Sequence, residues 1–265
     1  MKIVVIGGTG LIGSKVVRKL SQRGHQPVAA APNTGVNAFT GEGLAGAMAN
    51  AQIVIDVSNS PSFEEKAATS FFQTSGRNIA EAEVHAGVRH HVALSVVGTD
   101  RLQDSGYFRA KLAQEELIKS SPVPYSLVHA TQFFEFIRTI ADISTDRGTV
   151  RLPPVQFQPM AADDVAEAVV DAALGEPLNG TIEVRGPETF SLDGAVRKVL
   201  AFDHDPRSVI ADPKASYYGA QISDQTLVPG PGALLGSIKL DWWIANVPPP
   251  PKVVAVAAPS PVPAH

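Results

Sequence analysis

Three side chains in the middle of the chain have the types and spacing needed for proton transfer to a carbonyl oxygen. Tyr107 and Lys111 are four residues apart, which places a phenol and an amine on one face of a helix. Ser95 lies twelve residues before Tyr107, at the end of a predicted strand. In such a set the tyrosine donates the proton, the lysine ammonium lowers the pKa of the phenol, and the serine polarises the carbonyl. We therefore predict that Ser95, Tyr107 and Lys111 are catalytic.

The same spacing also has a purely structural interpretation. An exposed helix could pair Lys111 with Glu115, four residues further on, while Tyr107 packs on the sheet. The Tyr-x-x-x-Lys pattern is common when it stands alone. The elements that precede it decide between the two interpretations.

A glycine-rich turn opens the chain and indicates what those elements bind. Residues 2–6 are an apolar, β-branched run, residues 7–13 carry four glycines, and apolar residues at helical spacing follow. Strand, glycine turn and helix in this order predict a pyrophosphate site, made by backbone N–H groups and the helix N-terminus. The predicted dinucleotide contacts are Gly7, Thr9, Gly10, Leu11, Ile12 and Gly13. The alternative is a tight turn without a ligand, but a turn alone needs fewer glycines.

The second predicted strand bears on which dinucleotide binds. Residues 26–31 form this strand, and no acidic residue follows it where an NAD-specific site holds the ribose hydroxyls. An acid there would repel a 2′-phosphate, so its absence favours NADP(H) over NAD(H). Asn33 and Thr34 are the predicted hydrogen-bond donors to that phosphate, and Arg18 or Lys15 are the cations within sequence reach.

Further ligand contacts are expected where later strands end, because doubly wound sheets bind at the carboxyl ends of their strands. Residues 52–57 form a third strand, followed by Ser58, Asn59 and Ser60. An ordinary Asn-Ser-Pro turn explains that loop equally well. Ser95 ends the fourth strand, and Lys111 is placed to bind the nicotinamide ribose.

Strands alternate regularly with helices as far as about residue 143, which predicts an α/β fold with a doubly wound parallel sheet of the Rossmann type. We predict a dinucleotide-binding core over residues 1–150 and a small C-terminal region, residues 151–246, that caps a substrate pocket. Residues 247–265 are rich in proline and alanine and are predicted to be a disordered tail.

Composition excludes several functions. The 265 residues contain no cysteine, which rules out disulfides and thiol catalysis, and a net charge of −4 does not favour nucleic-acid binding. The seven histidines are scattered without metal-ligand spacing, so no metal site is expected. No apolar run reaches the ~20 residues of a membrane span, and we expect no signal peptide, because residues 1–6 do not resemble one. We expect a cytoplasmic protein with no nucleic-acid or membrane partner.

Together these motifs resemble the atypical short-chain dehydrogenase/reductase superfamily, in its NmrA-like NAD(P)-binding branch. The likeness runs from residue 1 to about 200 and includes the glycine turn, residues 78–90, the segment starting at Ser95, and Tyr107 with Lys111. The resemblance implies a Rossmann fold, NADP(H) more often than NAD(H), and a nicotinamide bordered by Ala130, Thr131 and Phe133. The turn at residues 129–133 departs from the Arg-Pro-x-x-Phe pattern usual in the family.

Two functions follow from these observations. The first is an NAD(P)H-dependent oxidoreductase that transfers hydride between nicotinamide and a carbonyl, quinone or enone. The second is a non-catalytic redox sensor that binds the dinucleotide and regulates a partner, although a sensor has no need of all three catalytic groups. Phe133, Phe134, Phe157 and the two tryptophans suggest a small apolar or aromatic substrate, and core packing explains them equally well.

Overall fold

Short runs of β-branched and apolar residues build the sheet at the centre of the protein. The structure is a computed structural model, and it describes residues 1–248. Seven strands lie in the order β12-β9-β5-β4-β3-β1-β2, and every neighbouring pair is parallel. Their bounds are β1 (Lys2–Ile6), β2 (Gln26–Ala30), β3 (Ile53–Asp56), β4 (His90–Val96), β5 (Tyr125–Ala130), β9 (Gly180–Arg185) and β12 (Leu234–Leu235). The predicted doubly wound Rossmann-type sheet is confirmed.

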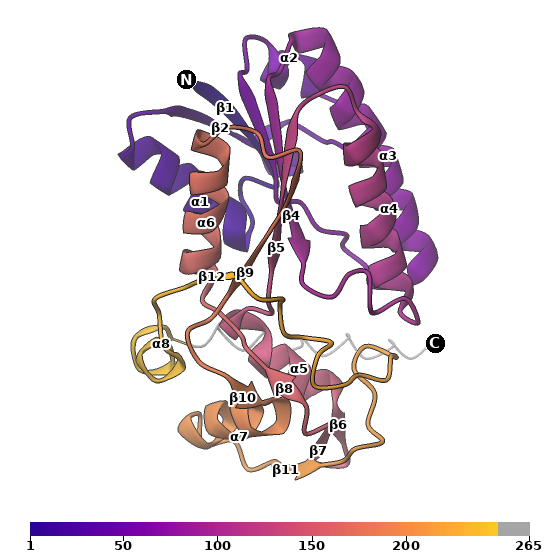
Figure 1. The fold of residues 1–265 in the computed structure, drawn as a ribbon, viewed down its shortest axis with the longest axis vertical. Coiled ribbons are helices and arrows are strands. Elements are labelled where there is room, and N and C mark those ends of the chain that lie inside the picture. Colours follow the sequence, from indigo (N-terminus) through magenta and orange to yellow (C-terminus); the bar gives the residue numbers. More distant parts are fainter. Residues whose placement is uncertain (249–265) are drawn as a thin grey trace, which may run out of the picture.

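Helices cover both faces of this sheet (Figure 1). On one face lie α1 (Leu11–Gln22) and α6 (Ala162–Leu174); on the other lie α2 (Leu44–Met48), α3 (Glu65–Ala86) and α4 (Gly106–Ser120). Successive residues of β1 point to opposite faces, so Ile3 packs toward α1 and α6 while Val4 packs toward α2 and α3. Both are fully buried, which explains why this strand reads as a continuous apolar run.

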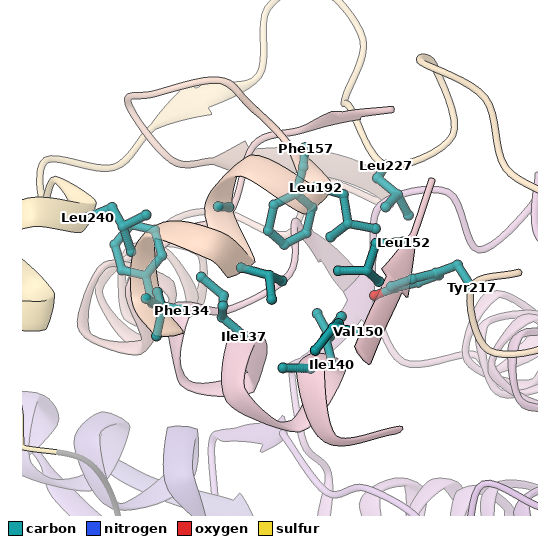
Figure 2. Packing of buried hydrophobic residues seen from close by; sticks show 14 of the residues in the cluster. Phe134, Ile137, Ile140, Val150, Leu152, Phe157, Leu192, Tyr217, Leu227 and Leu240 are labelled. Carbon is teal, nitrogen blue, oxygen red and sulfur yellow. The ribbon is translucent and has the colours of Figure 1, made fainter. Parts of the chain in front are cut away.

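A second layer lies beyond the carboxyl ends of the strands (Figure 1). It contains η2 (Phe134–Phe136), α5 (Ile137–Ile143), β6 (Thr145–Asp146), β7 (Thr149–Leu152), β8 (Gln156–Phe157), β10 (Phe190–Ser191), α7 (Leu192–Phe202), β11 (Ser208–Ala211) and α8 (Leu240–Asn246). Figure 2 shows its core, in which Phe134, Phe157 and Leu192 pack around Ile137 and Ile140. This layer has its own hydrophobic centre and covers the edge of the sheet.

The central sheet with its helices and the second layer are not separated by one boundary at residue 150. Both α6 and β9 come after that position, yet α6 packs on α1 and β9 pairs with β5 in the central sheet. Pairing with β9 satisfies the backbone groups on the open side of β5, which explains why the chain returns to the sheet. The second layer is thus built from residues 134–157 and from segments after residue 186.

Local features agree with the predicted elements except after β5. Gly87 ends α3 in the left-handed conformation, with φ of 67°, which glycine adopts readily. Helix α3 continues unbroken through Gly76. The segment that begins at Thr131 predicts a helix, but the chain stays extended to Phe133, because Phe133 and Met160 form a parallel bridge.

Two expectations concern the chain outside these elements. All but the first two residues of the predicted disordered tail, 247–265, lie outside the described residues. Within residues 1–248, no helix combines the length and apolarity that crossing a membrane requires.

Candidate functional site

The glycine turn between β1 and α1 can hold its shape only without side chains. Gly7 has a φ of 77°, a conformation that favours glycine. A Cβ atom on Gly13 would lie 2.1 Å from the Gly7 carbonyl oxygen, and one on Gly8 would lie 2.7 Å from the Ala29 Cα. Neither substitution fits, because the obstructing atoms belong to the backbone. The absence of a side chain on Gly13 therefore allows α1 to lie against the turn.

The N-terminus of α1 is left open by this arrangement. Gly10 is its N-cap residue, no side chain caps the helix, and the first turn contains no acidic residue. The first N–H groups of a helix lack partners within the helix and attract anions. Gly10, Leu11 and Ile12 also line a cavity. These residues fit the pyrophosphate of a dinucleotide, which the N–H groups of this turn would hold.

That cavity has a volume of about 580 Å³ and follows the carboxyl ends of the strands. The glycine turn, the last residues of β4, the residues after β2, β3 and β5, helix α4 and a loop of the C-terminal part all contribute to it. Of the predicted site residues it contains Gly7, Thr9, Gly10, Leu11, Ile12, Ser58, Asn59, Ser95, Tyr107, Lys111, Ala130, Thr131 and Phe133. The structure thus brings together the glycine turn and the three predicted catalytic side chains.

Four predicted contacts lie outside the cavity lining: Gly13, Asn33, Thr34 and Ser60. The Thr34 hydroxyl accepts the Ala31 N–H at 3.0 Å and donates to the Ala29 carbonyl at 2.8 Å, so it closes the turn after β2. The Ser60 hydroxyl accepts the Ser62 N–H at 3.2 Å. Asn33 stays close to the glycine turn, because its Oδ1 accepts from the Thr9 hydroxyl at 3.0 Å. Thr34 and Ser60 therefore have structural hydrogen bonds where ligand contacts were expected.

The two cations expected near a 2′-phosphate are directed elsewhere. Lys15 lies 2.6 Å and Arg18 lies 2.8 Å from the Asp163 carboxylate, so both join α1 to α6. Among residues 1–248, the cavity lining holds one charged side chain, Lys111. The part of the cavity after β2 is lined instead by neutral groups, among them Ala31, Pro32, Asn37, Ala38 and Phe39.

Tyr107 stands in the first turn of α4 and reaches across the cavity. Its hydroxyl donates to Asn59 Oδ1 at 2.9 Å, and its ring lies 5.1 Å from that of Phe63 and 6.1 Å from that of Phe72. Burial raises the pKa of the Tyr107 phenol well above its ordinary value. The expectation that Lys111 lowers this pKa is not met, because the groups that affect the phenol are Asn59 and Tyr218.

Lys111 is buried on the sheet side of the cavity. Its ammonium donates to the Leu94 carbonyl at 3.0 Å and to Gln114 Oε1 at 2.6 Å, and it lies 4.8 Å from the centre of the Phe72 ring. Burial lowers its pKa to about 8, against the opposing attraction of Asp56 and Glu115. An ammonium has three N–H donors, so two protein bonds leave one donor for a ligand.

Ser95 has a different partner from the one predicted. Its hydroxyl donates to Glu115 Oε1 at 2.5 Å, and the same carboxylate oxygen lies 3.0 Å from His129 Nε2. Although burial acts to raise the pKa of Glu115, its bonds with His129 and Ser95 hold that pKa below the ordinary value. The proton of Ser95 is thus committed to a carboxylate. Glu115 was also the predicted structural partner of Lys111, and it pairs with Ser95 and His129 instead.

Several cavity residues were not predicted from the sequence. Phe63, Phe136, Tyr217 and Tyr218 add aromatic rings, and Gln132 adds an amide beside Thr131. The paired tyrosines lie more than a hundred residues after Lys111 in a segment without regular structure, so no periodic pattern identifies them. Phe134 and Phe157, which suggested an apolar substrate, are fully buried in the second layer.

Comparison with known proteins identifies the family of this chain. A family model for NAD(P)H-binding proteins matches residues 7–176, and the chain belongs to that family. A search of curated proteins found no match. The NmrA-like branch within the family stays a prediction.

The fold is similar to that of several solved structures. A short-chain dehydrogenase/reductase superfamily protein from Agrobacterium tumefaciens with bound NAD is 18% identical, with 92% of this chain and 95% of that chain covered and a TM-score of 0.69. The dTDP-4-dehydrorhamnose reductase from Bacillus anthracis in complex with NADP is 15% identical, with 84% of this chain and 89% of that chain covered and a TM-score of 0.64. UDP-N-acetylglucosamine 4-epimerase from Bacillus cereus is 17% identical, with coverage of 80% and 85% and a TM-score of 0.64.

The buried Lys111 predicts a specific pH dependence of stability. The pKa of Lys111 is about 8 in the folded protein, whereas the ordinary lysine value, 10.5, applies to the unfolded chain. Between these two pH values the unfolded chain therefore binds more protons than the folded protein. Stability therefore rises with pH across this window, by about 1–3 kcal/mol. Lys111→Met should remove that rise. Urea unfolding of both proteins at pH 7 to 10 checks this, since equal slopes for the two would show that Lys111 titrates normally.

Proposed function

We propose that the protein is an NADPH-dependent reductase that acts on an apolar, planar carbonyl compound, quinone or enone. The observation that best supports this is the meeting of the open α1 N-terminus and the Tyr107 hydroxyl in one cavity. A dinucleotide held at the glycine turn and extending along this cavity would bring its reactive ring toward Tyr107. A bound nicotinamide supplies the hydride, and the chain's own groups must supply the proton.

Tyr107 is the proposed proton donor. Because burial raises its pKa, the phenol stays protonated through the neutral range, as an acid for reduction must. When a substrate carbonyl gains the hydride, its oxygen becomes basic and takes the phenolic proton. The Asn59 carboxamide, now the acceptor of that proton's hydrogen bond at 2.9 Å, holds the hydroxyl in the cavity until the substrate oxygen replaces it.

Lys111 and Ser95 support this step from the sheet side. We propose that the third N–H of the Lys111 ammonium binds the nicotinamide ribose, while Leu94 and Gln114 hold the ammonium in place. Ser95 positions Glu115 in the present arrangement. It reaches a substrate oxygen only if its hydroxyl leaves that carboxylate, so Tyr107 is the principal donor.

The substrate class follows from the rings around Tyr107. Phe63 lies 5.1 Å from Tyr107 and 5.7 Å from Tyr218, and Tyr217 and Tyr218 are 4.8 Å apart, all as ring-centre distances. Phe133 and Phe136, which also line the cavity, stack with their ring centres 5.5 Å apart. Aromatic side chains in such spacing pack well against flat, apolar ligands. A small aromatic quinone or cyclic enone fits this description.

A dinucleotide sensor without turnover is the second candidate. One observation favours it: the Ser95 proton is committed to the Glu115 carboxylate, so of the two expected hydroxyl donors only Tyr107 is not bound to a carboxylate. A sensor would bind the dinucleotide at the glycine turn and leave Tyr107 unused. Turnover with a quinone or enone separates the two candidates.

We propose that NADP(H) is preferred over NAD(H). The first support is that, among residues 1–248, no acidic side chain lines the cavity. The second is Asn33: its Oδ1 accepts a hydrogen bond from the Thr9 hydroxyl, so its amide nitrogen is left to donate to a phosphate. Arg18 and Lys15 do not contribute, because both bind Asp163.

Removing the Tyr107 hydroxyl tests the proposed reaction. Tyr107→Phe should lower kcat for NADPH-dependent reduction of 1,4-naphthoquinone or 2-cyclohexenone by about 100-fold or more, because a positioned acid contributes at least that factor. The dissociation constant for NADPH should change by less than about threefold. The matched control, Tyr218→Phe, removes a hydroxyl from the same cavity and should keep most of the activity. Full activity in Tyr107→Phe would show that this phenol is not the acid.

An acidic residue beside the glycine turn tests the cofactor preference. Asn33→Asp keeps the size of the side chain but introduces a charge that repels a 2′-phosphate and can bind ribose hydroxyls. The ratio of NADPH to NADH affinity should fall by about tenfold, which is about 1.4 kcal/mol. Calorimetric titration of both dinucleotides measures this ratio. A wild-type protein without preference, or an unchanged ratio in the variant, would contradict the proposed role of Asn33.

A further inference from the structure

Asp56, the last residue of β3, is a buried carboxylate that does not line the cavity. It is 2% exposed, and within residues 1–248 it is not among the residues of the cavity lining. A buried charge is costly unless it is paired and hydrogen-bonded. Both oxygens of Asp56 accept hydrogen bonds, so its carboxylate has a fixed position from which it can act on the site.

The first oxygen of Asp56 is held by the turn that follows β3. Asp56 Oδ1 accepts from the Ser58 N–H at 2.9 Å and from the Ser58 hydroxyl at 2.6 Å. These two bonds require only an acceptor oxygen, which an amide side chain also provides. The hydrogen bonds to Ser58 can therefore be kept in a variant that removes the charge.

The second oxygen of Asp56 leads to Lys111. The Gln114 amide nitrogen donates to Asp56 Oδ2 at 2.9 Å, and Gln114 Oε1 accepts from the Lys111 ammonium at 2.6 Å. An ammonium can only donate and an ionised carboxylate can only accept, so these neighbours fix which end of the amide faces each of them. All three side chains are buried. Asp56 therefore determines how Gln114 presents its oxygen to the lysine.

The charge of Asp56 acts on Lys111 together with other charged groups. Burial lowers the pKa of Lys111, and the negative charges of Asp56 on β3 and Glu115 on α4 oppose that effect. Glu115 also lies 3.0 Å from His129 on β5. Asp56 in turn favours the protonated form of His91 on β4. A change at Asp56 therefore acts on two cations, of which Lys111 is the one in the cavity lining.

We propose that Asp56 is a positioning residue for Lys111, because through the Gln114 amide it keeps the ammonium charged and directs its remaining N–H toward the dinucleotide. The inference rests on the proposed function, which gives Lys111 a ligand to bind. The chain of hydrogen bonds exists without a ligand, so its effect on Lys111 is measurable whether or not a dinucleotide binds.

Exchanging the acid and the amide tests the proposal while nearly conserving the size of both side chains. Asp56→Asn keeps an acceptor for Ser58 but sets two amide NH₂ groups against each other. Gln114 cannot turn its oxygen to the new amide without placing its own NH₂ on the Lys111 ammonium. The double variant Asp56→Asn/Gln114→Glu has the net charge of the wild-type protein and restores the chain of bonds, because the introduced carboxylate can accept both from Lys111 and from the introduced amide.

The first readout is the pH dependence of stability, measured by urea unfolding without a ligand. In the wild-type protein the rise in stability should begin near the pKa of Lys111, which is about 8. Asp56→Asn removes one attraction for the ammonium, so the rise should begin about one pH unit lower. In the double variant the carboxylate accepts directly from Lys111, so the rise should begin about one pH unit higher than in the wild-type protein.

A matched background separates these shifts from other effects of the substitutions. Both shifts should vanish when Lys111→Met is also present, which would exclude His91 as their source. A loss of packing alone would lower stability at every pH and leave the start of the rise in place. Because the double variant keeps every hydrogen bond, its shift tests the proposal even if Asp56→Asn does not fold.

The second readout is the affinity for NADPH, measured by calorimetry at pH 7. Asp56→Asn should weaken binding by about tenfold, since a hydrogen bond from the ammonium is misdirected, and the double variant should bind within about threefold of the wild-type protein. If the wild-type protein does not bind NADPH, the proposed function fails, and the pH readout still decides whether Asp56 acts on Lys111. The proposal is overturned if the rise in stability begins at the same pH in all three proteins, or if the double variant binds NADPH as weakly as Asp56→Asn.

Discussion

The site depends on one close contact, the approach of α1 to the turn that precedes it. Gly13 lies so near the Gly7 carbonyl that a single methyl group would separate helix and turn. This contact places the open N-terminus of α1 at the carboxyl edge of the sheet, where the cavity begins. Lys15 and Arg18, on the same helix, bind Asp163 and so hold α1 against α6. The basic residues of this helix therefore fix its position and leave anion binding to the backbone.

Behind the cavity, buried polar side chains join α4 to the central sheet. Gln114 accepts from Lys111 at 2.6 Å and donates to Asp56 at 2.9 Å, which links the lysine to the end of β3. Glu115 similarly binds Ser95 and lies 3.0 Å from His129 on β5. Buried charges are costly unless they are paired, and here the pairs tie α4 to three neighbouring strands. Tyr107 and Lys111 thus stand on a helix whose position is fixed by hydrogen bonds, as preorganised chemistry requires.

The sequence was sufficient for features that depend on local patterns. Strand, glycine turn and helix follow from composition and spacing, and so does the placement of Tyr107 and Lys111 on one helix. What depended on distant segments could not be predicted. Tyr217 and Tyr218 enter the cavity from an irregular loop, and β9 returns to the sheet after residue 150. The spacing of residues in the sequence also does not show which group a polar side chain will bind. Ser95 binds Glu115, Lys15 binds Asp163, and Thr34 closes its own turn.

The central claim is that the cavity at the sheet edge binds a nicotinamide dinucleotide through the turn at Gly7 to Gly13. The most direct measurement is a calorimetric titration of the purified protein with NADPH, NADP⁺, NADH and NAD⁺. The account predicts saturable binding at one site, with the phosphorylated pair bound more tightly. Absence of binding by all four would contradict it, since the glycine turn would then be a structural feature without a ligand.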